Sequence, residues 1–133
     1  MRLKEYFENK GGKSILSSAD SGGKVTSAIY SKPHVFEDGT IAFVMRKRLT
    51  HENLQTNPYC SYMFIEDGAG YGGIRLYLKK IKESTDDALI EKMKRRHISA
   101  EEDKAKGPRF LVHFSVEKIL PLIGDGDADV TVR

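Results

Sequence analysis

The sequence predicts a mainly β protein, a six-stranded antiparallel barrel that is closed or nearly closed and carries two or three short helices. Three observations support this fold class. Segments that alternate apolar and polar residues recur along the chain. Turns that contain glycine join the early segments as hairpins. Those early segments also lack the helical crossovers that parallel strands require. With 133 residues, the chain is expected to form a single domain over 1–133.

The first half of the chain divides into a helix and two hairpins. Leu3, Tyr6 and Phe7 fall at helical spacing and predict a short helix that ends at a glycine pair. Strands are then expected over 14–19 and 24–31, joined by a turn with two glycines. A second hairpin is expected to pair a short segment at 34–36 with a strand at 40–45 through an Asp-Gly turn.

A brief helix is expected over 50–56, with Thr50 as its N-cap because a hydroxyl can accept from first-turn amides. Asn57-Pro58 should end this helix, since a residue before proline avoids the helical region. Further strands are predicted over 59–66, 74–82 and 109–120 from their alternation.

Between the last two strands, the acidic segment 84–87 is expected to open a third helix. That helix should close at the basic run 94–97, and a polar connector should follow over 99–106.

Composition limits the classes of function. Hydrophobic residues make up 39% and charged residues 31% of the chain, the balance of an ordinary folded protein. A net charge of +3 permits an anionic ligand without indicating nucleic acid. Cys60, the single cysteine, lies in an apolar run and is expected to be a buried, inert thiol. No segment approaches the length of a membrane span, and a cytoplasmic location is expected.

Two familiar motifs are present in outline and are rejected. The glycines of 68–73 match a dinucleotide-binding pattern, but a strand follows them where a helix would have to begin, so we interpret them as a hairpin loop. Asp125, Asp127 and Asp129 resemble the start of a calcium loop, yet Val130 occupies the position that requires glycine. The four histidines share no spacing that would converge on a metal, and no metal is expected.

The junction between the strand at 40–45 and the following helix is the strongest candidate site. Helix-start amides carry partial positive charge, and arginine provides a planar donor fork that matches phosphate oxygens. A compact phosphate site is therefore one interpretation of this junction. A solvated basic turn stabilised by Glu52 or other acids is the other, and spacing alone leaves both open. The junction residues are Arg46, Lys47, Arg48, Leu49 and Thr50.

Three stretches resemble the pyridoxamine 5′-phosphate oxidase-like family of FMN-binding split barrels. They are the run 27–34, the turn 37–40 and the block 43–58, which ends in Asn-Leu-Gln-Thr-Asn-Pro. The resemblance covers roughly 14–82, and the strand from Arg109 is compatible with it. It implies a six-stranded antiparallel split β-barrel of Greek-key order, forming one FMN-binding domain.

The resemblance also implies a homodimer with FMN at the subunit interface. Phe43 and Val44 would lie along the ribityl chain and ring, and Arg75 would make a polar contact to the ring. The junction Arg46, Lys47, Arg48, Leu49 and Thr50 would surround the phosphate. The isoalloxazine would lie along the backbone of Ser27, Ala28, Ile29, Tyr30 and Ser31.

Two departures argue against vitamin B6 oxidation. Leu49-Thr50 stands where the true oxidases carry a basic pair, and 124–133 has no counterpart of their substrate-recognising segment. A flavin-dependent oxidoreductase that uses a small-molecule electron donor or acceptor is therefore expected, with no catalytic residue assigned. A non-enzymatic flavin-binding or electron-carrier protein is the alternative.

A nucleic-acid-binding barrel is a third hypothesis, because small barrels bind single strands on aromatic faces framed by basic residues. It is disfavoured because Phe43, Tyr59, Tyr62 and Phe64 lie within apolar strands. Neither a nucleic acid nor a membrane is expected as a partner.

Overall fold

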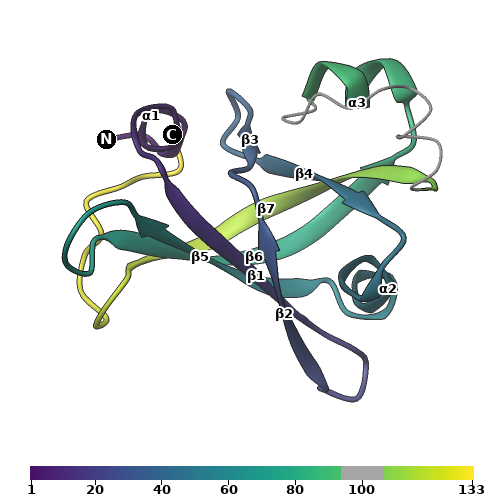
Figure 1. The fold of residues 1–133 in the computed structure, drawn as a ribbon, viewed down its shortest axis with the longest axis horizontal. Coiled ribbons are helices and arrows are strands. Elements are labelled where there is room, and N and C mark those ends of the chain that lie inside the picture. Colours follow the sequence, from purple (N-terminus) through teal and green to yellow (C-terminus); the bar gives the residue numbers. More distant parts are fainter. Residues whose placement is uncertain (94–106) are drawn as a thin grey trace.

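One antiparallel sheet of seven strands curls into a half-barrel (Figure 1). A computed structural model describes residues 1–93 and 107–133. Seven strands replace the predicted six because the two-residue β3 pairs with β4. The elements are α1 (Leu3–Asn9), β1 (Gly12–Ala19), β2 (Val25–Tyr30), β3 (His34–Val35), β4 (Ile41–Arg46), α2 (Leu49–Thr56), β5 (Tyr59–Glu66), β6 (Gly73–Ser84), α3 (Asp87–Met93) and β7 (Arg109–Pro121).

The strands follow the order β2-β1-β5-β6-β7-β4-β3, so β2 and β3 form the two edges. Every ladder between the described strands of this sheet is antiparallel, as the hairpin pattern predicted. The barrel was expected to be closed or nearly closed, and it is open, because no ladder among the described residues joins β2 to β3 or β4. This opening leaves β2 with one unpaired side.

The main core fills the concave side of the sheet. Tyr62 and Phe64 on β5 and Phe114 on β7 are fully buried there. Helix α1 covers one end of this core with Leu3, Tyr6 and Phe7, its three buried residues. The rings of Phe7 and Phe64 meet edge to face at 5.4 Å, a favoured aromatic geometry.

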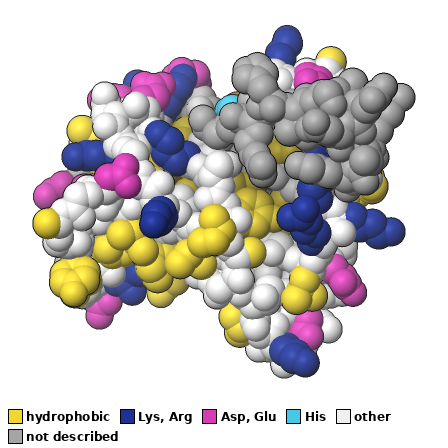
Figure 2. Space-filling view, viewed as in Figure 1, with side chains coloured by type: hydrophobic (Ala, Val, Ile, Leu, Met, Phe, Trp, Pro, Cys, Tyr) yellow, Lys and Arg dark blue, Asp and Glu magenta, His cyan; other side chains and the backbone are white. Residues whose placement is uncertain are grey.

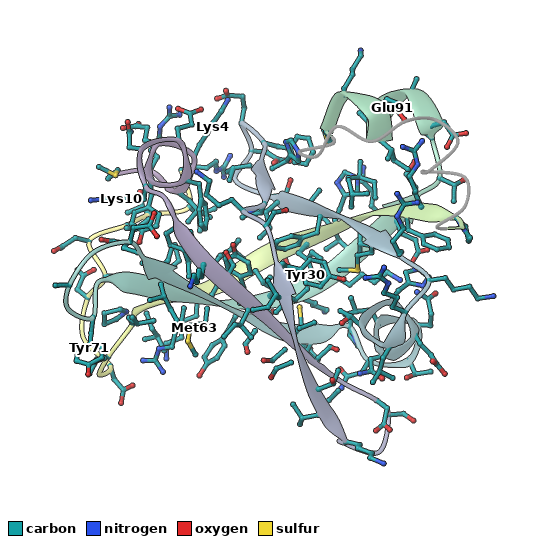
Figure 3. The ribbon with its side chains drawn as sticks, in the orientation of Figure 1. Lys4, Lys10, Tyr30, Met63, Tyr71 and Glu91 are labelled. Carbon is teal, nitrogen blue, oxygen red and sulfur yellow. The ribbon has the colours of Figure 1, made fainter. Side chains whose placement is uncertain are left out.

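A smaller apolar cluster lies under α3, on the other face of β4. Ala42, Leu111 and Ile90 are completely buried in it. Arg109 holds α3 to β7 by donating to Glu91 at 2.7 Å (Figure 3). The predicted basic end of this helix, 94–97, and the connector 99–106 lie outside the described residues. None of the helices within the described parts is long and apolar enough to cross a membrane.

The β3–β4 turn depends on Asp38 and Gly39. Asp38 Oδ1 accepts from the Thr40 amide at 2.9 Å and from the Thr40 hydroxyl at 2.6 Å. Gly39 has a φ of +88°, and an added Cβ would lie 2.3 Å from Val132 Cγ1. Both the backbone conformation and the packing of the C-terminal segment therefore require glycine.

We expect Gly39→Ala to lower the free energy of unfolding by roughly 2 kcal/mol, since a side chain at positive φ costs about 1–3 kcal/mol. Urea denaturation followed by circular dichroism would measure this loss. Gly126→Ala is the matched control, because a Cβ at Gly126 meets no atom within 4 Å. Equal unfolding free energies for the two variants would contradict this account of the turn.

Candidate functional site

The β4–α2 junction presents the uncapped start of a helix. Arg48 is the N-cap of α2, with an extended backbone (φ −135°, ψ −178°) and no side-chain hydrogen bond to the helix. The prediction of Thr50 as N-cap was wrong, because α2 begins at Leu49 and Thr50 is its second residue. The amides of Leu49, Thr50 and His51 have no carbonyl one turn earlier within the helix to accept them.

A groove of about 540 Å³ lies against this helix start, lined by Lys47, Arg48, Leu49, His51, Glu52 and Gln55. Two of these residues are cations and one is an acid. Among the ion pairs of the described residues, none joins Glu52 to Lys47 or Arg48. Glu52 therefore does not neutralise these two cations by direct pairing. The groove is positively charged beside a helix N-terminus.

Tyr30 connects β2 to this junction. Its hydroxyl lies near the side chain of Thr50, which is buried. Burial raises the pKa of Tyr30, while the neighbouring Thr50 side chain and the Arg48 charge oppose that rise. The Tyr30 ring packs edge to face on Phe43 at 5.7 Å, deep in the half-barrel (Figure 3). Three predicted site residues, Tyr30, Arg48 and Thr50, thus come together.

Arg46 lies apart from that group. Its Nη1 donates to the Gly107 carbonyl at 3.1 Å. Alternation along β4 places Arg46 on the same face as Ala42 and Val44, which pack in the cluster under α3. Arg46 and Arg48, which are close in the sequence, therefore lie in different environments. Of the two, only Arg48 lines the groove.

The other predicted site residues are distributed over several surfaces. Phe43 is only 3% exposed, so its side chain belongs to the core. Val44 is half-buried against the α3 cluster. Arg75 donates to the carbonyls of Pro121, at 2.9 Å, and Gly124, and so anchors the C-terminal segment. Along the edge strand β2 and just beyond it, exposure alternates over Ser27, Ala28, Ile29, Tyr30 and Ser31.

A polar cluster beside the groove was not predicted. Glu83, near the end of β6, accepts hydrogen bonds from His51 at 3.0 Å, Gln55 at 3.0 Å and Lys80 at 2.6 Å. Burial alone would raise the pKa of Glu83, but these three bonds outweigh it and bring the pKa to about 2. A register shift between Lys80 and Lys82 sets which way Glu83 faces, and alternation in the sequence cannot reveal such a shift.

Cys60 carries no chemistry at this site. Its thiol is buried, and burial raises its pKa to about 12. A thiol with so high a pKa stays protonated at neutral pH and is a poor nucleophile. The prediction that this cysteine is buried is confirmed.

No protein-family model matches this chain, and no curated protein does. Solved structures do. An FMN-binding protein from Syntrophomonas wolfei matches with a TM-score of 0.74 and 20% identity, over 92% of this chain and 85% of that one. HutZ, a heme storage protein from Vibrio cholerae, matches with a TM-score of 0.65 and 18% identity, over 91% and 95%.

A pyridoxamine 5′-phosphate oxidase-like protein from Lactobacillus delbrueckii also matches, with a TM-score of 0.63 and 14% identity, over 87% and 88% of the two chains. At these identities the likeness establishes the fold. The chain therefore has the fold of the FMN-binding and pyridoxamine 5′-phosphate oxidase-like proteins, in agreement with the resemblance of its sequence.

Proposed function

We propose that this protein binds FMN as a member of the pyridoxamine 5′-phosphate oxidase-like family, with the flavin phosphate at the start of α2. One observation carries the proposal. The N-terminus of α2 is uncapped and opens beside a groove that Lys47 and Arg48 line. Helix amides and arginine together are a recurrent phosphate-binding arrangement.

The chemistry of these donors suits a phosphate monoester. The amides of Leu49, Thr50 and His51 supply directed hydrogen bonds, and the two groove cations offset the dianion. Arg46 supports the junction from the other face through its bond to Gly107. Binding of the phosphate would therefore depend directly on Arg48 and Lys47. Arg46 would contribute indirectly, by holding the β4–α2 loop in position.

The edge strand β2 suits the flavin ring. An edge strand leaves alternate backbone amides and carbonyls without a ladder partner, and these can bond the polar edge of an isoalloxazine. The backbone from Ser27 to Ser31, with Ala28, Ile29 and Tyr30 between them, would supply those groups. Phe43 and Val44 would contact the ribityl chain and ring through their backbone or, for Val44, through its partly buried side chain. Arg75 would reach the flavin only by releasing the carbonyls that it now binds.

Bound FMN would supply hydride or single-electron transfer, and the residues of this chain would bind it, orient it and exclude water. No general acid or base is assigned. The reaction would be that of a flavin-dependent oxidoreductase with a small-molecule electron donor or acceptor. A cytoplasmic location agrees with the single buried thiol.

The proposed homodimer has a matching surface on the outer face of the sheet. Register places Ile29, Ile15 and Met63 side by side on that face across β2, β1 and β5. Ile29 is 77% exposed and Met63 37%. Figure 2 shows hydrophobic side chains gathered in a band where Figure 3 labels Met63. Exposed apolar patches of this kind mark interaction surfaces, and a second copy would bury this one.

Arg48→Ala should weaken FMN binding about ten- to hundredfold, because charge-assisted hydrogen bonds contribute roughly 1.5–3 kcal/mol each. Riboflavin, which lacks the phosphate, should bind Arg48→Ala and the unaltered protein equally. Quenching of flavin fluorescence would measure both affinities, with Lys24→Ala in the β1–β2 turn as the control cation. Equal losses for FMN and riboflavin would show that the phosphate lies elsewhere.

Ile29→Glu should convert the dimer to a monomer, because the interface would then bury an unpaired carboxylate. Light scattering coupled to size exclusion would measure the mass. Ile81→Glu changes another exposed isoleucine outside the patch and should leave the dimer intact. A monomeric wild-type protein in the presence of FMN would exclude the proposed assembly.

The oxidoreductase proposal predicts that the FMN-loaded protein oxidises reduced nicotinamide, in the presence of an electron acceptor, faster than free FMN does. Loss of absorbance at the nicotinamide wavelength measures this rate. A rate equal to that of free FMN, with flavin demonstrably bound, would favour the electron-carrier alternative.

A further inference from the structure

Glu83 contacts two residues that line the proposed phosphate groove but does not line the groove itself. His51 and Gln55 line that groove, and the nitrogen of each donates to the Glu83 carboxylate at 3.0 Å. Because a carboxylate at neutral pH only accepts, His51 Nε2 carries a hydrogen in this contact. One residue on β6 therefore fixes two side chains on the groove-facing side of α2.

His51 is held from a second direction by Phe110 on β7. The two rings are stacked, with centroids 3.9 Å apart and planes inclined by 16°. His51 is also the third residue of α2, so its amide is one of the three uncapped donors. Fixing this ring fixes the first turn of the helix that would meet the phosphate.

Lys80 links Glu83 to the C-terminal end of α2. Its Nζ donates to Glu83 at 2.6 Å and to the Leu54 carbonyl at 3.4 Å, and its amide donates to the Pro58 carbonyl at 2.7 Å. The segment from Lys80 to Glu83 therefore holds α2 near both ends. Lys80 also offsets the charge of Glu83, so that a carboxylate can stand close to a phosphate with little repulsion.

We infer that Glu83 is a positioning residue for phosphate recognition, which holds the first turn of α2 in place through His51 and Gln55. This inference rests on the proposed function. Loss of the carboxylate charge would leave three donors competing for a neutral amide, and poorly satisfied donors turn toward other partners. The first-turn amides would then meet the phosphate less often in the bound geometry.

The test compares FMN with riboflavin in Glu83→Gln, a substitution of nearly equal shape. The measured quantity is the ratio of the riboflavin Kd to the FMN Kd, which isolates the phosphate contribution. We expect this ratio to fall about tenfold, while the riboflavin Kd and the circular dichroism spectrum stay unchanged. Glu117→Gln, which alters an exposed carboxylate on β7, should keep the wild-type ratio.

A second variant tests the inference even if Glu83→Gln fails to fold. Lys80→Met retains the aliphatic stem but leaves the Glu83 charge without its ammonium, and it should also lower the ratio. A Glu83→Gln ratio equal to wild type overturns the inference, as does an equal loss of both flavins, which would indicate a merely structural role. A wild-type ratio near one overturns the proposed function itself, and the role assigned to Glu83 with it.

Discussion

Helix α2 is attached to the sheet mainly through polar side chains, and the candidate site depends on that attachment. Its buried residues are Thr50, His51, Asn53 and Leu54, of which only one is apolar. A buried polar side chain must find a hydrogen-bond partner or cost roughly 1–3 kcal/mol. His51 bonds Glu83, Asn53 donates to Ser18 at 3.1 Å, and Thr50 lies beside Tyr30. These contacts reach β6, β1 and β2.

This mode of attachment has a consequence for recognition. Apolar packing is tolerant of small rotations, whereas hydrogen bonds to separate strands restrict both the rotation and the tilt of a helix. The start of α2 therefore has a defined direction relative to β2, the strand proposed to line the flavin ring. A phosphate and a ring joined by a ribityl chain of fixed length would benefit from that restriction.

The strand pattern was largely predictable because alternation and turn residues are local signals. The extents of β5, β6 and β7 differ from prediction by two residues or fewer at each end, and both early hairpins form. The N-cap of α2 was placed two residues late, since Thr50 is a favoured cap residue and Arg48 is not. Burial of Thr50 against Tyr30 outweighed that preference.

The site was less predictable than the fold because its geometry depends on long-range register. Arg46 and Arg48 belong to the same basic run of the sequence. Strand alternation nevertheless directs Arg46 toward Gly107, while Arg48 lies at the groove. Glu83 is 32 residues from His51, and the register shift in β6 that brings them together has no sequence signature. A shared fold also does not establish a shared reaction, so the chemistry rests on the residues of this groove.

A crystal structure of the protein with FMN tests the central claim most directly. We expect the flavin phosphate to lie within hydrogen-bond distance, about 3 Å, of the amides of Leu49, Thr50 and His51 and to contact Arg48. A phosphate bound at another surface, with the start of α2 open to solvent, would contradict it.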